Sequence, residues 1–262
     1  MGMVGRNIFV TDLAAVLRPM GPKAMAAKAS DARFSAVWIR VGRGATADPN
    51  LALADLPKLK GELDRAGIGL WGWHVSFCAD QAAARNEVAK VVGWADRHSL
   101  DGIVVDAERT RESPRFRGGA AEAGLYAETL AQGLAGKGRA IALSSHDQPS
   151  LHRDLPFAAF LQHIDDMCPQ IYYRSTSVSP RFKKSVRDYQ ALVPANSFKA
   201  RFKPTGNVTI SDDLPLPDVA TCLTAAQRFM ALVKEGGFGA YSFWSWDSAP
   251  DEIFDLLRDT PV

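Results

Sequence analysis

The 262-residue sequence is poor in cysteine, in net charge and in long apolar runs, and each shortage narrows what the chain can be. Cys78, Cys168 and Cys222 are odd in number and far apart, which argues against a disulfide framework and against a tetrahedral zinc site. We expect them to be buried free thiols. Lysine and arginine exceed aspartate and glutamate by 31 to 29, so the charge balance indicates no nucleic-acid or membrane partner.

Signals for targeting, nucleotides and metals are also missing. The first ten residues hold one arginine and a short apolar stretch, too little for a signal peptide or a membrane span. We therefore expect synthesis in the cytoplasm, with any export by a route other than the general secretory one. No Gly-rich phosphate loop follows the first apolar run, and the five histidines lack the His-Glu-x-x-His spacing, so neither a cofactor nor a metal site is expected.

What the sequence does contain is an alternation of apolar runs and amphipathic stretches from end to end. Strands are expected at 7–13, 36–42, 70–77, 102–108, 140–145, 167–173, 198–202 and 239–246. Helices are expected at 51–66, 81–98, 120–135, 157–163, 180–192, 219–234 and 251–257. About eight β/α units predict the α/β class and a single (β/α)8 TIM-type barrel domain over 1–262, with a doubly wound open sheet as the alternative.

Two carboxylates follow the most apolar of these runs. Asp106 and Glu108 stand at the carboxyl end of the expected fourth strand, directly after residues 103–105. Because side chains alternate along a strand, the two acids point the same way, and barrel active sites lie at this end of the strands. The pair is suited to acid catalysis. In the structural alternative, the two acids cap the next loop or form ion pairs with Arg109 and Arg111.

Other expected strand ends carry aromatic and polar side chains of the kind that bind sugars. Indole faces stack on sugar C–H surfaces, and polar edges bind hydroxyl groups, so a polysaccharide is the expected partner. Core packing is the alternative role for the aromatic candidates and for the histidine. The candidates for substrate binding are Asp12, Arg40, Trp73, His74, Gln170, Trp244, Trp246 and Asp247, with Tyr172 beside the acid pair.

The expected seventh strand is informative because it has no carboxylate. Many retaining glycosidases use a second carboxylate as the nucleophile, and residues 198–202 offer none, so we do not expect that mechanism. In this strand Lys199, Arg201 and Lys203 would form a basic edge able to contact an anionic sugar.

Three motifs resemble those of the chitinase family of glycoside hydrolases. Asp101-Gly102-x-x-x-Asp106-x-Glu108 resembles the family's fourth-strand Asp-Gly-x-Asp-x-Asp-x-Glu, whose last residue is the acid. Gln170-Ile171-Tyr172 resembles the Gln-x-Tyr of hevamine-like chitinases, and residues 239–245 resemble the last-strand Gly-x-x-x-x-Trp. The resemblance implies Glu108 as general acid, Asp106 as its assistant, and Tyr172 bound to the acetamido oxygen of the substrate, whose own N-acetyl group attacks.

The sequence departs from that pattern at one position, because Val104 stands where the family has its first inner aspartate. The chain is also similar to the Chalaropsis-type lysozyme family, which cleaves peptidoglycan without that earlier aspartate. Here the matching parts are Asp12, 37–42, 72–77 and 106–108.

Together these observations predict a glycoside hydrolase acting on a polymer of N-acetylated sugars, peptidoglycan or chitin-like. The alternatives are a catalytically silent barrel that binds glycan or a protein partner, which Val104 would allow, and a metal-dependent barrel phosphodiesterase. The sequence does not indicate the oligomeric state.

Overall fold

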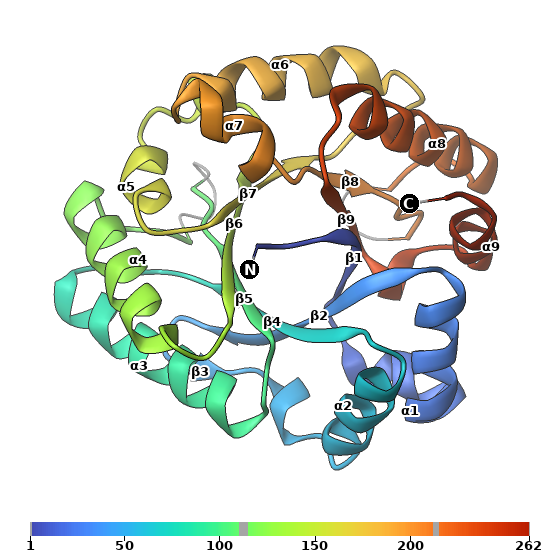
Figure 1. The fold of residues 1–262 in the computed structure, drawn as a ribbon, viewed down its shortest axis with the longest axis horizontal. Helices are drawn as coiled ribbons and strands as arrows, with labels where there is room; N and C mark the ends of the chain where they lie inside the picture. The colour runs from blue at the N-terminus through green and yellow to red at the C-terminus, as the bar shows by residue number, and fades with distance from the viewer. Residues whose placement is uncertain (1, 110–114, 212–214, 262) are drawn as a thin grey trace.

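The computed structural model describes residues 2–109, 115–211 and 215–261, and within them eight parallel strands close into a barrel (Figure 1). Strand β1 pairs with β9 on one side and with β2 on the other, which completes the ring, and a short β3 (Thr46–Ala47) adds to β2 in antiparallel fashion. The predicted (β/α)8 barrel is confirmed. The barrel strands are β1 (Gly5–Val10), β2 (Phe34–Arg43), β4 (Gly69–Val75), β5 (Gly102–Asp106), β6 (Ala140–His146), β7 (Asp166–Ile171), β8 (Thr205–Asn207) and β9 (Ala240–Trp244).

An outer ring of helices covers the strands (Figure 1). Three of these helices begin at an aspartate whose carboxylate accepts a hydrogen bond from a backbone N–H of the first turn, as at Asp12, Asp80 and Asp218. No helix in the described part of the chain is long and apolar enough to cross a membrane. The helices are α1 (Leu13–Asp31), α2 (Leu56–Arg65), α3 (Gln81–Arg97), α4 (Ala120–Leu134), α5 (Phe157–Leu161), α6 (Val178–Gln190), α7 (Ala195–Arg201), α8 (Val219–Gly236) and α9 (Asp251–Asp259).

The barrel interior is filled by apolar side chains, separately from the core between strands and helices. Indole rings occupy much of the interior, with Trp38 stacked on Trp71 at 5.8 Å, and four alanines leave room for them. The chain enters at the amino end, where the backbone N–H of Met3 donates to Asp166 at 2.6 Å. The interior is thus a packed floor below the carboxyl ends of the strands. Its members are Met3, Phe9, Ala36, Trp38, Trp71, Trp73, Val75, Val104, Ala140, Ala142, Cys168 and Ala240.

The three cysteines are free and buried, as predicted. Burial raises the pKa of Cys222 to about 12, and it raises the pKa values of Cys78 and Cys168 as well. Thiols in such surroundings remain protonated at neutral pH.

The predicted strand at 198–202 is wrong, because this segment belongs to helix α7. Phe198 and Phe202 are four residues apart, so the helical turn brings their rings to 5.1 Å, both facing the core. Arg201 closes the helix against its neighbours by donating to the backbone carbonyls of Leu161 and Ile164, each at 2.7 Å.

The seventh barrel strand is instead β8, which has only three residues and contains no apolar run. Thr205 shares a hydrogen bond of 2.8 Å with Ser242 of β9. Gly206 faces Phe229 of α8, where a Cβ would lie 2.9 Å from a ring carbon, so the close approach of helix and strand requires glycine.

Candidate active site

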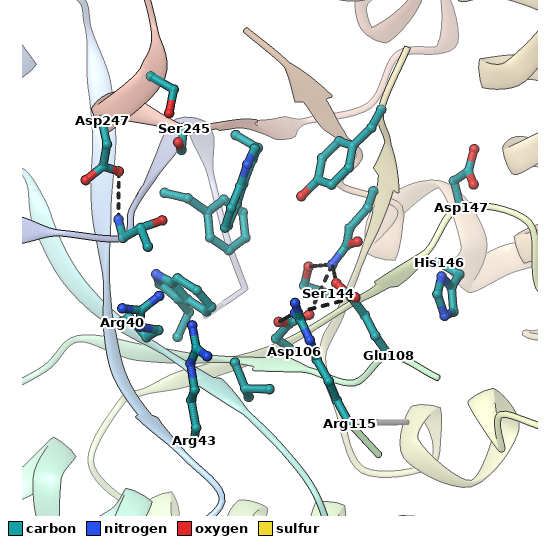
Figure 2. Close-up of a pocket in the computed structure, with 18 of the residues that line it drawn as sticks. Arg40, Arg43, Asp106, Glu108, Arg115, Ser144, His146, Asp147, Ser245 and Asp247 are labelled. Carbon is teal, nitrogen blue, oxygen red and sulfur yellow. Dashed lines mark hydrogen bonds and ion pairs between the residues drawn. The ribbon is translucent and has the colours of Figure 1, made fainter. Parts of the chain in front are cut away.

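A cavity of about 600 Å³ opens at the carboxyl ends of the barrel strands (Figure 2). Nine of the residues proposed from sequence line it: Asp12, Arg40, Trp73, Asp106, Glu108, Gln170, Tyr172, Trp244 and Asp247. The other described lining residues are Phe9, Thr11, Arg43, Val75, Arg115, Ser144, His146, Asp147, His152, Arg174, Arg181, Ser245 and Ser248.

The two acids of the fourth strand lie together on one side of this cavity (Figure 2). Asp106 ends β5 and is buried, whereas 19% of the Glu108 side chain is exposed. A single amide nitrogen on β7, Nε2 of Gln170, lies 3.0 Å from Oδ1 of Asp106 and 2.8 Å from Oε1 of Glu108. It also lies 3.1 Å from Oγ of Ser144 on β6, so three neighbouring strands fix the geometry of the pair.

The environment of Asp106 favours its protonated form. Burial is the largest cause that raises its pKa well above the usual range, followed by the negative charge of Glu108 and a hydrogen bond with it. Arg115 and Gln170 act in the opposite direction. Burial and the neighbouring carboxyl group outweigh these two effects, so the pKa of Asp106 remains raised.

The cation near this pair is Arg115. Its Nη1 lies 3.5 Å from Oε2 of Glu108 and 3.7 Å from Oδ2 of Asp106. Arg109, the partner considered in the structural alternative, instead donates to the backbone carbonyls of Phe116 and Asp154, at 3.0 and 2.9 Å. Arg111 lies outside the described residues.

Aromatic side chains form another wall of the cavity. Trp244, at the end of β9, is partly exposed, and its ring lies 5.6 Å from that of Trp73 and 6.2 Å from that of Tyr172. Trp73 is 2% exposed and donates from its indole to the backbone carbonyl of Val10 at 3.0 Å. Trp244 therefore presents more of its ring to a ligand, and Trp73 supports it from below.

The remaining carboxylates of the cavity are bound by protein groups. Asp247 accepts hydrogen bonds of 2.7 Å from the backbone N–H groups of Thr11 and Asp12, and Asp12 caps α1 (Figure 2). Asp147 accepts two hydrogen bonds from Arg181 of α6, at 2.5 and 3.0 Å. Asp106 and Glu108 are thus the pair least committed to holding the fold.

Two residues proposed for the site lie elsewhere. Strand alternation turns Trp73 into the barrel and His74 outward, where its ring nitrogens lie 2.8 Å from Tyr126 Oη and from the backbone carbonyl of Gly44. Burial lowers the pKa of His74 to about 4, so it is a neutral core histidine. Trp246 has left the strand for a 3-10 turn, η3 (Trp246–Ser248), and packs 4.8 Å from Phe254 in the core.

Of the positively charged residues that line the cavity, only Arg40 is among those proposed from sequence for the described site. Lys199 and Arg201 belong to α7, and neither they nor Lys203 is among the described residues that line the cavity, so the proposed basic strand is wrong. The arginines present are Arg40, Arg43, Arg115, Arg174 and Arg181. Arg43 follows an expected strand end, whereas no pattern in the sequence separates Arg115 or Arg181 from surface arginines.

No metal site is found among the residues that the structure describes, because no three His, Cys, Asp or Glu side chains group closely enough to hold an ion.

Known proteins with similar structures are found although the sequence itself matches no family model and no curated protein. A chitinase of glycoside hydrolase family 18 from Pseudoalteromonas aurantia has a TM-score of 0.67 and 14% identity, covering 97% of this chain and 98% of that one. The spore cortex-lytic enzyme SleL of Bacillus cereus has a TM-score of 0.66 and 11% identity, covering 97% of this chain and 73% of that one. An endo-β-N-acetylglucosaminidase from Cordyceps militaris has a TM-score of 0.66 and 10% identity, covering 98% of this chain and 90% of that one.

The chain has the barrel fold of these glycoside hydrolases. The resemblance to chitinases, proposed from three strand-end motifs, is therefore confirmed for the fold. At the position of the missing inner aspartate, Val104 is fully buried among the apolar side chains inside the barrel. Asp106 consequently stands on an apolar floor, which accounts for burial as the main cause of its raised pKa.

Proposed function

We propose that this chain is a glycoside hydrolase that cleaves a polymer of N-acetylated sugars, chitin-like or peptidoglycan, with Glu108 as the general acid. The observation that carries the proposal is the pair of acids Asp106 and Glu108, both hydrogen-bonded to Gln170 at the edge of an aromatic-lined cavity. Two kinds of solved neighbour support the substrate class, namely the chitinases and an enzyme whose name describes lysis of spore cortex.

Glu108 rather than Asp106 is the proton donor, because it is the acid that a ligand can reach. Its side chain is 19% exposed, against 6% for Asp106. A general acid must lie within hydrogen-bond distance of the leaving oxygen, and Asp106 is too deep in the barrel for that contact.

The nucleophile is the acetamido group of the substrate. A protein nucleophile would have to be a free carboxylate near the pair, and the other described carboxylates of the cavity are held by backbone N–H groups or by Arg181. An attacking group supplied by the sugar removes the need for one.

The reaction then proceeds in two steps. The acetamido oxygen attacks the anomeric carbon while the glycosidic bond breaks, and Glu108 gives its proton to the leaving oxygen. Asp106 accepts a hydrogen bond from the acetamido N–H and holds that group in place, and Tyr172 donates to the acetamido oxygen. Glu108 then takes a proton from water, which attacks the same carbon and restores the acetamido group with retained configuration.

The test is cleavage of N-acetylglucosamine oligomers and of peptidoglycan, with de-N-acetylated oligomers of equal length as the matched control. We expect new reducing ends from at least one N-acetylated substrate, first appearing as the retained anomer in NMR spectra, and none from the control. Binding of both N-acetylated glycans without any turnover would support the silent barrel instead. Equal cleavage of the de-N-acetylated oligomer would overturn the substrate-assisted mechanism.

A further inference from the structure

An irregularity in β2 brings two arginines to the same side of the cavity. Residues three apart on a regular strand point to opposite faces. Here Arg40 pairs with Trp73 of β4, and Arg43 pairs with Val75, two residues further along β4, because the register shifts between Arg40 and Gly42. Such bulges insert one extra residue and redirect the side chains that follow.

The bulge is built into the packing of the strand. The extra residue is Val41, and Gly42, which follows it and pairs with His74, faces Trp94 of α3, where a Cβ would lie 2.5 Å from a ring carbon. The position after the bulge therefore fits against the helix layer only as glycine. As a result, Arg40 and Arg43 both line the cavity, and Figure 2 shows their side chains on the side of the cavity from which Arg115 also rises.

The guanidinium group of Arg43 is close enough to those of Arg40 and Arg115 to be repelled by both. The pKa of Arg43 is lowered, first by burial and then by the positive charges of Arg40 and Arg115. Nε of Arg40 is bound to Asp48, and Arg115 lies 3.5 Å from Glu108. Arg43 forms no ion pair with any residue that the structure describes.

The acids near these cations leave Arg43 without an ion-pair partner among the described residues. Asp48 binds Arg40, Asp106 and Glu108 lie near Arg115, Asp147 binds Arg181, and Asp12 and Asp247 accept hydrogen bonds from backbone N–H groups. The side of the cavity formed by Arg40, Arg43 and Arg115 therefore keeps the guanidinium group of Arg43 available to an anion beside the acid pair.

We propose that Arg40, Arg43 and Arg115 form a subsite for an anionic substituent, a carboxylate or a sulfate ester, on the sugar polymer. The guanidinium group binds planar oxyanions through two parallel N–H donors, and Arg43 has its donors directed into the cavity. Because Arg115 contacts Glu108, the charged substituent lies on a sugar next to the bond that is cleaved. This inference rests on the proposed function, and it narrows the substrate to acidic glycans.

The test measures binding by calorimetry to the Glu108→Gln variant, so that no ligand is consumed. The ligands are a neutral N-acetylglucosamine oligomer, the same oligomer with a lactyl carboxylate on alternate sugars, the methyl ester of that carboxylate, and a sulfated oligomer. We expect at least one anionic ligand to bind about 10–100 times more tightly than the uncharged ones, the range of a charge-assisted hydrogen bond. The carboxylate and sulfate arms then identify the anion.

The control variants separate this subsite from general attraction. Arg43→Gln added to Glu108→Gln should reduce the preference for the anion about tenfold or more and leave the neutral oligomer bound within about twofold. Arg85→Gln, at an exposed position of α3, should change neither. Equal affinity for the carboxylate and its ester, together with no gain from sulfate, would overturn the subsite, as would an unchanged preference in the Arg43 variant.

The binding measurement does not depend on turnover, so it tests the subsite separately from the proposed hydrolysis. A protein that cleaves no glycan but binds the anionic oligomer through Arg43 refutes the proposed hydrolysis and retains the subsite. A protein that cleaves neutral and anionic oligomers with equal kcat/KM, and binds them equally, retains the hydrolysis and refutes the subsite.

Discussion

Gln170 donates a hydrogen bond of 2.8 Å to Oε1 of Glu108, and the same nitrogen lies 3.0 Å from Asp106. Since β7 is separated from β5 by β6 alone, the closed barrel sets this distance. The amide favours the ionised form of Asp106 and thereby limits how far burial raises its pKa. Gln170 is a positioning residue for the acid pair.

Replacement of Gln170 by alanine should change the pH profile of hydrolysis. The loss of a donor that lowers the pKa of Asp106 raises that pKa further, so the part of the pH profile that the ionisation of Asp106 sets moves to higher pH. We also expect kcat to fall about tenfold or more as the pair loses its alignment. Gln132→Ala, at an exposed position of α4, is the control. A pH profile that stays in place would contradict this role.

Glu108→Gln should remove nearly all turnover while leaving the fold intact. A general acid contributes roughly 10²–10⁴-fold, and the amide cannot supply the proton. The measurement is kcat on the best N-acetylated oligomer, with the thermal unfolding midpoint recorded in parallel. Glu128→Gln on the exposed face of α4 should retain full activity. Activity of Glu108→Gln within a few fold of the parent would remove Glu108 from the mechanism.

Two tryptophans that are two residues apart should give opposite results when replaced by alanine. Trp244→Ala removes a ring from the cavity, so we expect KM to rise about tenfold or more with a small loss of stability. Trp246→Ala removes a ring that packs on Phe34 and Phe254, so we expect about 3–5 kcal/mol less stability at unchanged KM. Steady-state kinetics and denaturant unfolding of both variants test the assignment, and the reverse pattern would refute it.

His74 should make stability depend on pH. Its folded pKa of about 4 lies below the usual 6.5, so its contribution is complete above pH 6.5 and is lost as the pH falls toward 4. His74→Gln is expected to be less stable than the parent at pH 7, with a difference that shrinks by up to about 1.4 kcal/mol per pH unit below 6.5. Urea unfolding at several pH values measures it, with His163→Gln, an exposed change, as control. A difference that is constant with pH would show that His74 is not the titrating group.

The sequence predicts the barrel well where strands are apolar, and it fails at β8. Residues 198–202 alternate in polarity like a strand, but Phe198 and Phe202 are also four residues apart, so the same pattern suits a helix. The true strand, Thr205–Asn207, is held by a hydroxyl pair and a glycine contact with a helix. Neither feature has a periodic signature.

In the site, too, some residues could be predicted from the sequence and others could not. Asp106, Glu108 and Gln170 were accessible from sequence because alternation and strand ends place them together. Consistent use of the same alternation would have excluded His74, since Trp73 beside it points inward. The position of Arg43 depends on a one-residue register shift, which is accompanied by close packing of Gly42 against Trp94. Such a shift is a tertiary effect, which the strand pattern does not contain.

The thiols of Cys78, Cys168 and Cys222 are buried and protonated, so they should react little with thiol-directed labels. Maleimides and spin labels react with accessible thiolates, so a single cysteine introduced on an exposed helix position would be modified selectively. Dyes attached in this way would report ligand binding by fluorescence without prior removal of the native cysteines.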